Sequence, residues 1–273
     1  MKLATLRTGQ GTTAAVERDG TFRTLPFDDV GALLRTGPAK IEKQMAADGI
    51  PVDEADFAPL VTAPGKIICV GLNYRTHIRE MNRELPTHPT LFAKFADALI
   101  GANDDIVLPP GSSAVDWEAE LALVIGETVS RATEQQAGEA IAGFTVANDI
   151  SARDFQKYTL QWLQGKTFDQ TTPLGPTLVT VDETGLDPDL SLECRVDDVL
   201  KQQARTNDLV FPPTALVRYI SAITTLRPGD VILTGTPGGV GAGRDPQEFL
   251  SEGRTVTTRI AGIGACHNLC SAR

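Results

Sequence analysis

Residues 116–126 read Asp116-Trp117-Glu118-Ala119-Glu120-Leu121-Ala122-Leu123-Val124-Ile125-Gly126. Polar and apolar side chains alternate along this stretch. This pattern predicts a β-strand, because successive side chains of a strand point to opposite faces. Glu118 and Glu120 therefore leave one face, while Trp117, Ala119, Leu121 and Leu123 leave the other. Two carboxylates on one strand face repel each other unless a cation joins them.

A third carboxylate and a lysine follow this stretch. Residues 144–150 form an apolar run that predicts a strand delivering Asn148 and Asp149 at its end, and Lys166 comes after the next predicted helix. Glu118, Glu120 and Asp149 would form an oxygen-only ligand set, which suits Mg²⁺ or Mn²⁺, with Ca²⁺ as a further option. The strand pattern by itself favours a simpler alternative, in which the glutamates line the solvent face of a half-buried strand and Lys166 is an exposed lysine.

Length and composition indicate a globular protein that acts on small molecules. The chain has 273 residues and a net charge of −10, and its Lys and Arg residues are scattered rather than clustered. We therefore expect no nucleic-acid or membrane partner. The N-terminus has no apolar signal core and no apolar run approaches the roughly 20 residues of a membrane span, so we expect a cytoplasmic protein.

The four cysteines are too few and too irregularly spaced for a disulfide framework. Cys266, His267 and Cys270 offer at most three zinc ligands.

The order of predicted elements indicates an α+β, β-rich fold, without the regular strand–helix alternation of a doubly wound sheet. Residues 1–63 predict a small N-terminal α/β domain with strands at 2–7 and 12–17 and helices at about 28–36 and 39–48. Residues 64–273 predict a second, larger domain, which contains all the candidate functional groups and is therefore the expected catalytic domain. Within it we expect a helix from Thr133 to near Gly143, a helix capped by Ser151, a hairpin across Asp197-Asp198, and a last strand at 255–260 before the tail.

Two further segments carry candidate functional groups. His77 and Glu80 are three residues apart in a predicted helix, which places them on one face, although the spacing alone favours a solvated charged helix with an incidental histidine. The glycine-rich loop 235–243 lacks the dinucleotide and Walker patterns. Its backbone amides, including that of Gly235, and the Thr236 hydroxyl could bind a substrate carboxylate, and a mobile surface loop is the alternative.

The order and spacing of several motifs resemble the fumarylacetoacetate hydrolase (FAH) family, in particular its small bacterial-type members. The resemblance runs through nearly all of residues 66–262 and more loosely through the N-terminal domain. It rests on Val70-Gly71-Leu72-Asn73-Tyr74 with His77 and Glu80, Glu118-x-Glu120, Asn148-Asp149-Ile150-Ser151-Ala152-Arg153-Asp154 with Gln156, Lys166-Thr167-Phe168-Asp169, Pro173-Leu174-Gly175-Pro176, and residues 229–237. The chain departs from the family pattern at Asp197-Asp198 and in the tail from Cys266 to Arg273.

The resemblance implies a mixed β-sandwich roll, assembled as a homodimer, whose Glu118, Glu120 and Asp149 hold Mg²⁺ or Mn²⁺. It implies substrates that are 2-oxo or enol acids. Lys166 would stabilise a developing oxyanion, and Arg153, Gln156, Gly235 and Thr236 would bind the acid. His77, polarised by Glu80, would act as a general base on a helix that closes over the substrate.

These roles lead to one main functional hypothesis and several alternatives. The main hypothesis is a metal-dependent hydrolase that cleaves the C–C bond of a 2,4-dioxo acid such as an acylpyruvate or fumarylacetoacetate. The alternatives are a decarboxylase of an oxaloacetate-like 2-oxo acid and an isomerase or tautomerase of the 2-hydroxyhepta-2,4-diene-1,7-dioate type from aromatic catabolism. A non-catalytic metabolite binder would have no need of the His77–Glu80 pair.

Overall fold

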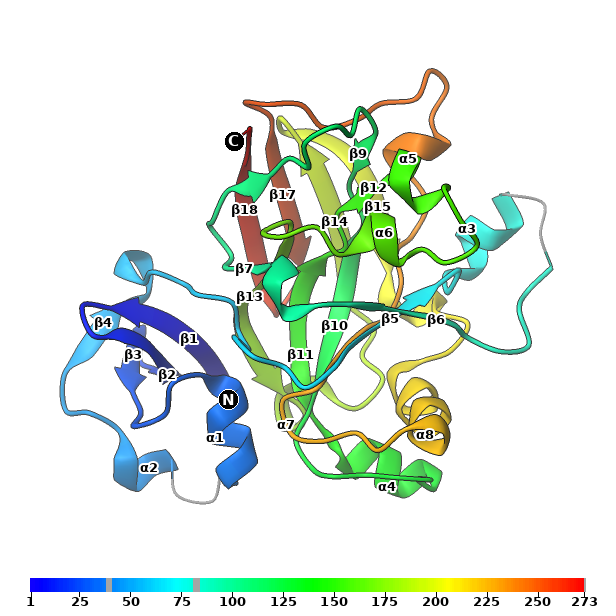
Figure 1. The fold of residues 1–273 in the computed structure, drawn as a ribbon. Coiled ribbons are helices and arrows are strands. Elements are labelled where there is room, and N and C mark those ends of the chain that lie inside the picture. The colour runs from blue at the N-terminus through cyan, green and yellow to red at the C-terminus, as the bar shows by residue number, and fades with distance from the viewer. Residues whose placement is uncertain (38–40, 81–83, 273) are drawn as a thin grey trace.

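The computed structural model describes residues 1–37, 41–80 and 84–272, apart from a few side chains, and it is dominated by two mixed β-sheets (Figure 1). The larger sheet has 11 strands. Its main path runs in space through β4 (Gly49–Pro51), β3 (Thr21–Thr24), β2 (Gly11–Arg18), β1 (Lys2–Thr8), β13 (Thr172–Thr180), β11 (Ile141–Asn148), β10 (Ala119–Ile125), β16 (Val231–Leu233), β5 (Ile67–Gly71) and β6 (Thr90–Lys94), and β7 (Leu99–Ile100) pairs with β13.

The smaller sheet has five strands, and a separate pair of short strands lies near its edge. In spatial order the five are β15 (Val199–Arg205), β14 (Ser191–Val196), β17 (Thr255–Ile260), β18 (Gly264–Ser271) and β8 (Ile106–Val107), and the pair is β9 (Val115–Asp116) with β12 (Ser151–Ala152). Parallel pairs occur in both sheets, namely β16 with β5, β13 with β7 and β18 with β8. The β-rich, mixed-sheet fold predicted from the sequence is therefore confirmed.

The helices are short. They are α1 (Val30–Thr36), α2 (Ile41–Gln44), α3 (Arg75–Glu80), α4 (Glu134–Glu139), α5 (Arg153–Gln156), α6 (Leu163–Lys166), α7 (Val181–Thr184) and α8 (Pro213–Ile223). None of them, in the ranges that the structure describes, is long and apolar enough to cross a membrane. Figure 1 shows β1–β4 at one side of the molecule and α3, α5 and α6 at the other, near β5 and β6.

Strand β10 is buried on both faces, which explains its almost entirely apolar C-terminal half. Leu121 and Leu123 point into a core shared with strands of the smaller sheet, which contribute Leu192 and Val256. Ala122 and Val124 point into a second core on the opposite face of the large sheet. The alternation read from residues 116–126 is thus confirmed, and the alternative of a half-buried strand with a solvent face is wrong.

The N-terminal strands extend the large sheet. Strand β1 pairs antiparallel with β13, with Leu3 opposite Leu178. The extended segment that follows is packed as well: the amide of Leu60 donates to the carbonyl oxygen of Leu174 at 3.0 Å. The N-terminal region is thus joined to the rest by backbone hydrogen bonds, and a domain boundary at residue 63 stays a prediction.

The local structure follows some of the sequence predictions and departs from others. Thr133 forms the expected capping box with Gln136, but the helix ends at Glu139 because β11 begins at Ile141. The hairpin across Asp197-Asp198 is confirmed, and both turn residues have positive φ, at 48° and 63°. Ser151 does not cap a helix. It pairs with Asp116 in the β9–β12 ladder, and its hydroxyl donates to the carbonyl oxygen of Asp149 at 2.8 Å.

The C-terminal tail forms a strand that sequence reasoning missed. Residues 264–271 form β18, which pairs with β17 along six residues. Alternation along β18 buries the thiols of Cys266 and Cys270 and exposes His267 on the other face. These three side chains therefore do not converge on one ion.

Candidate active site

Three carboxylates converge where β10 and β11 lie side by side. Ala119 is opposite Asn148 in the antiparallel ladder, so Glu118 and Asp149 meet just beyond it, and the Asp149 amide donates to the Glu118 carbonyl oxygen at 2.8 Å. One carboxylate oxygen each from Glu118, Glu120 and Asp149 lies within 4.8 Å of the others, and all three residues are buried. The three residues that the sequence predicted as metal ligands are thus brought together by strand pairing.

Three buried cations surround these carboxylates. Lys166 Nζ lies 2.7 Å from Glu118 Oε2 and 2.7 Å from Asp149 Oδ2. Lys94 Nζ lies 2.7 Å from the other oxygen of Asp149, and Arg153 Nη1 lies 2.6 Å from Glu118 Oε1. The buried charges therefore nearly balance, which lowers the cost of removing them from water.

The carboxylates differ in their electrostatic environment. Burial raises the pKa of Glu120 well above its ordinary value, and the neighbouring Asp149 and Glu118 raise it further. Burial also disfavours the charged form of Asp149, but Lys166 and Lys94 outweigh this and lower its pKa. For Lys166, burial favours the neutral amine, yet Asp149 and Glu118 raise the pKa, so the side chain stays an ammonium ion.

The chemistry of this donor set fits a hard divalent cation. Oxygen-only ligation by three carboxylates is typical of Mg²⁺ and Mn²⁺ sites that keep positions open for water and substrate. Glu120 has no buried cation paired with it among the described residues, and its Oε2 accepts only the backbone N–H of Gly235, at 2.6 Å. A cation held by Glu118, Glu120 and Asp149 would supply the counter-charge that Glu120 lacks.

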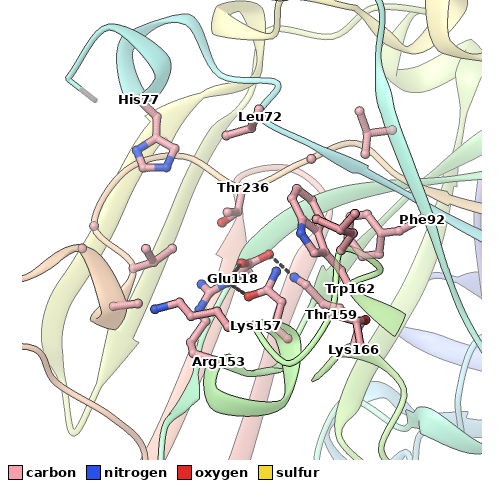
Figure 2. Close-up of a pocket in the computed structure, with 18 residues that line it drawn as sticks. Leu72, His77, Phe92, Glu118, Arg153, Lys157, Thr159, Trp162, Lys166 and Thr236 are labelled. Carbon is pink, nitrogen blue, oxygen red and sulfur yellow. Dashed lines mark hydrogen bonds and ion pairs between the residues drawn. The ribbon is translucent and has the colours of Figure 1, made fainter. Parts of the chain in front are cut away.

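A cleft of about 720 Å³ opens beside these groups (Figure 2). Glu118, Arg153 and Lys166 lie at its base, and Phe92 and Trp162 form an aromatic wall, with ring centroids 5.3 Å apart in an edge-to-face arrangement. A Cβ atom added to Gly71 would lie 2.4 Å from the Trp162 ring, so glycine at this position allows the wall to form. This volume is in the range of small-molecule sites.

The four predicted substrate-binding residues have different roles in this geometry. Arg153 donates to Asp116 Oδ2 from Nε and to Gln156 Oε1 from Nη1 at 3.1 Å, so the Gln156 amide nitrogen stays available to the cleft. The Thr236 hydroxyl donates to the Ala119 carbonyl oxygen at 3.0 Å and accepts from Gln202. With its proton already used, this hydroxyl can accept from a ligand but not donate to a carboxylate.

The backbone amide of Gly235, which the sequence predicted to bind substrate, contacts a metal-ligand candidate. Its N–H donates to Glu120, as described above, and its φ of +106° favours glycine. An added Cβ would lie 2.9 Å from Asn73 Cβ, and the Asn73 side chain donates to the Thr234 carbonyl oxygen at 2.8 Å. Asn73 therefore fixes the turn that presents the Gly235 amide to Glu120.

His77 lies on α3 and lines the cleft, and Figure 2 shows its ring above Glu118 and Arg153. This position allows it to reach a bound ligand. Glu80 ends the same helix, and its side chain lies outside the described part of the chain, so its pairing with His77 stays a prediction.

Sequence reasoning missed two residues that hold this site together. Lys94, at the end of β6, is fully buried and pairs with Asp149; its only sequence signal is a lysine closing an apolar strand. Asp116 accepts from Arg153 Nε at 2.8 Å and from the amides of Gly241 and Ala242 at 2.6 and 3.0 Å. It therefore joins Arg153 to the glycine-rich loop, a link between segments that are distant in sequence.

Known proteins with similar sequences agree with the family resemblance of the motifs. Residues 66–270 match the model of the fumarylacetoacetate hydrolase C-terminal family. A Bos taurus protein, oxaloacetate tautomerase FAHD2B, mitochondrial, is 47% identical over 221 residues, which cover 80% of this chain and 70% of that protein. The Homo sapiens oxaloacetate tautomerase FAHD2A, mitochondrial, is 46% identical over the same coverage.

Solved structures agree along the whole length. The fumarylacetoacetate hydrolase from Exiguobacterium antarcticum has a TM-score of 0.89 at 31% identity, with 100% of both chains covered. The 2-hydroxyhepta-2,4-diene-1,7-dioate isomerase from Mycobacterium marinum has a TM-score of 0.81 at 32% identity, covering 100% of this chain and 99% of that one. Sequence motifs, fold and matches coincide, and the chain belongs to the fumarylacetoacetate hydrolase family.

Proposed function

We propose that the protein is a Mg²⁺- or Mn²⁺-dependent enzyme that interconverts the keto and enol forms of a 2-oxo acid of the oxaloacetate type. The observation that carries this proposal is the buried Glu118–Glu120–Asp149 cluster at the base of a 720 Å³ cleft. The names of the relatives support it, because two of them are oxaloacetate tautomerases and one structural neighbour is a dienedioate isomerase. This replaces C–C hydrolysis as the main hypothesis.

The residues of the cleft suit a proton transfer next to a carbonyl group. When bound, a divalent cation polarises a chelated 2-oxo group and stabilises the negative charge of the enolate. Asp149 and Glu118 raise the pKa of Lys166 in the metal-free protein, and as an ammonium ion it would donate a hydrogen bond to a developing oxyanion. The Gln156 amide nitrogen is available to orient the substrate carboxylate. His77 is the acid–base candidate on the opposite side of the cleft.

Hydrolysis of a 2,4-dioxo acid is the second candidate, and the position of His77 on the cleft favours it. A base at this position could activate water, as the His77–Glu80 pair does in the hydrolytic mechanism that the family resemblance implies. Decarboxylation of oxaloacetate would use the same enolate stabilisation without the water. The three reactions would use the same metal site and would differ in the role of His77.

A substrate panel distinguishes these reactions. Oxaloacetate enol decay, oxaloacetate decarboxylation and acetylpyruvate cleavage would each be followed in Mg²⁺ and in Mn²⁺, with Glu118→Ala as the matched inactive variant. We expect the wild type to accelerate oxaloacetate tautomerisation and Glu118→Ala not to do so. Acetylpyruvate cleavage without any tautomerisation would overturn the proposal in favour of the hydrolase.

A homodimer and a cytoplasmic location also remain predictions. The dimer rests on the family resemblance alone. The two relatives compared above carry the word mitochondrial in their names, which leaves the compartment of this chain to be tested by cell fractionation.

A further inference from the structure

Three polar side chains of the cleft come from a single helical turn. Arg153, Gln156 and Lys157 lie at positions i, i+3 and i+4 of α5 and its C-cap, and all three line the cleft. Residues with this spacing share one face of a helix, with Cβ atoms roughly 6 Å apart. The turn therefore presents two cations to the cleft at different distances from the metal-ligand candidates.

The two cations differ in what they already bind. Arg153 is buried and held by Asp116 and Glu118. Lys157 is exposed, and among the residues that the structure describes no carboxylate pairs with its ammonium group. Lys157 lines the cleft, and Figure 2 shows its side chain extending away from Glu118. Its charge is therefore available to a ligand.

The backbone that carries Lys157 is fixed on several sides. The Asp154 carboxylate accepts from the Ser112 hydroxyl and the Ser113 amide, at 2.8 and 3.0 Å, and the Lys157 amide donates to the Asp154 carbonyl oxygen. On the other side, α6 packs so closely that a Cβ added to Gly165 would lie 2.5 Å from the backbone nitrogen of Gln156. The backbone of the turn that carries Lys157 is thus held in place, which reduces the entropy lost when Lys157 binds a ligand.

The charges below Lys157 leave it without a role in balancing the metal site. Four buried carboxylates, those of Asp116, Glu118, Glu120 and Asp149, face three buried cations, those of Lys94, Arg153 and Lys166. A divalent cation would turn the single excess negative charge into a single positive one. One substrate carboxylate neutralises that charge, and a second carboxylate on the same substrate would need a cation of its own.

We propose that Lys157 binds this second carboxylate, so that the site selects 2-oxo dicarboxylic acids over 2-oxo monocarboxylic acids. The inference rests on the proposed function, because it takes the first carboxylate and the 2-oxygen to lie at the Glu118–Glu120–Asp149 cluster. It adds a residue that determines specificity. Lys157 contacts the far end of the substrate, while the reacting atoms lie near Lys166.

Two inert ligands with the same chelating end test this assignment. N-oxalylglycine carries an oxalyl group and a remote carboxylate, whereas oxamate carries the oxalyl group alone. Their dissociation constants would be measured calorimetrically with Mn²⁺ for the wild type, Lys157→Met and Lys157→Arg. The control is Lys2→Met, which removes the same charge from a partly exposed lysine on β1, away from the cleft.

We expect Lys157→Met to weaken N-oxalylglycine roughly fivefold, as for a solvent-accessible ion pair of close to 1 kcal/mol. Oxamate affinity should stay unchanged in that variant, Lys157→Arg should keep most of the N-oxalylglycine affinity, and Lys2→Met should behave as the wild type. If Lys157→Met changed the affinity for both ligands equally, or for neither, the assignment of Lys157 would be wrong, while the proposed function would stand. A wild type that binds neither ligand would overturn the proposed function, and the inference with it.

Discussion

Replacing Glu120 with glutamine should stabilise the metal-free protein and remove its response to divalent metal. The Glu120 side chain is buried, and ligand oxygens of Glu118 and Asp149 lie within 4.8 Å of its own. Glutamine has the same shape, and its oxygen can accept the 2.6 Å hydrogen bond from Gly235. The substitution therefore removes a charge and keeps the packing.

The size of the effect follows from the geometry. Two unit charges 4.8 Å apart repel by about 3 kcal/mol at an effective dielectric constant of about 20. The attraction between Glu120 and the ammonium of Lys166 offsets part of this repulsion. We therefore expect a gain of about 1–3 kcal/mol in the metal-free state, or a rise in Tm of roughly 2–4 °C per kcal/mol. For the wild type, metal at 100 times its Kd should add about 2.7 kcal/mol, and the variant should lose this gain.

The pH dependence has a defined sign. Because the pKa of Glu120 is raised in the folded, metal-free protein, the folded state holds this proton more tightly than the unfolded state. The stability that Glu120 contributes is fully present below its unfolded pKa, near the ordinary value of 4.5, and is lost as the pH rises through the higher folded pKa. The stability of Glu120→Gln should not fall with rising pH in this way, because glutamine does not titrate.

The assay is thermal and urea unfolding followed by circular dichroism, in EDTA and in Mg²⁺ or Mn²⁺, across a pH series. Glu252→Gln, at an exposed turn, is the control for removing one negative charge. If Glu120→Gln were less stable than the wild type in EDTA, or if metal raised its Tm as much as that of the wild type, Glu120 would not be a repelled carboxylate in a metal site.

Four further predictions follow from the site and the fold. Glu118→Ala should abolish metal-dependent turnover, and full activity would remove Glu118 from the site. His77→Ala should lower kcat by roughly 10²–10⁴ while oxamate binding persists, and unimpaired turnover would exclude His77 from the mechanism. The four buried thiols should resist Ellman's reagent in the native protein, since burial raises the pKa of Cys194 to about 12; rapid labelling would contradict this. Light scattering should give about twice 29.1 kDa, whereas the monomer mass would contradict the dimer.

The directions of Glu118 and Glu120 were predictable because they depend on local geometry, whereas their expected role as metal ligands came from the family resemblance, since the strand pattern alone favoured solvent-facing glutamates. A period of two along residues 116–126 places Glu118 and Glu120 on one face whatever surrounds the strand. The position of Asp149 beside Glu118 depends in addition on how β11 pairs with β10. The pairing of Ala119 with Asn148 supplies that contact, and the apolar composition of both strands favours it.

The partners of these carboxylates were not predictable in the same way. Lys94 is 55 positions from Asp149, and Gly241 is 125 positions from Asp116, so nothing local links them. Ser151 shows the converse case. Its local sequence predicts a helix cap, but tertiary pairing with Asp116 offers the backbone a ladder hydrogen bond and the helix starts later. Local rules fail where a distant partner satisfies the same polar group.

Under the proposed function, the groups that would stabilise an enolate lie apart from the groups that would select the substrate. The carboxylates lie on and beside β10 and β11 in the middle of the large sheet, where cores on both faces hold them in place. The groups above them come from α3, α5 and the segment that leads into α6, at the edge of the fold. A substitution at Lys157 or Trp162 can therefore change which acid binds without disturbing the ion pairs below. A substitution at Lys94 or Asp116, by contrast, would leave a buried charge unpaired and affect every reaction that the site performs.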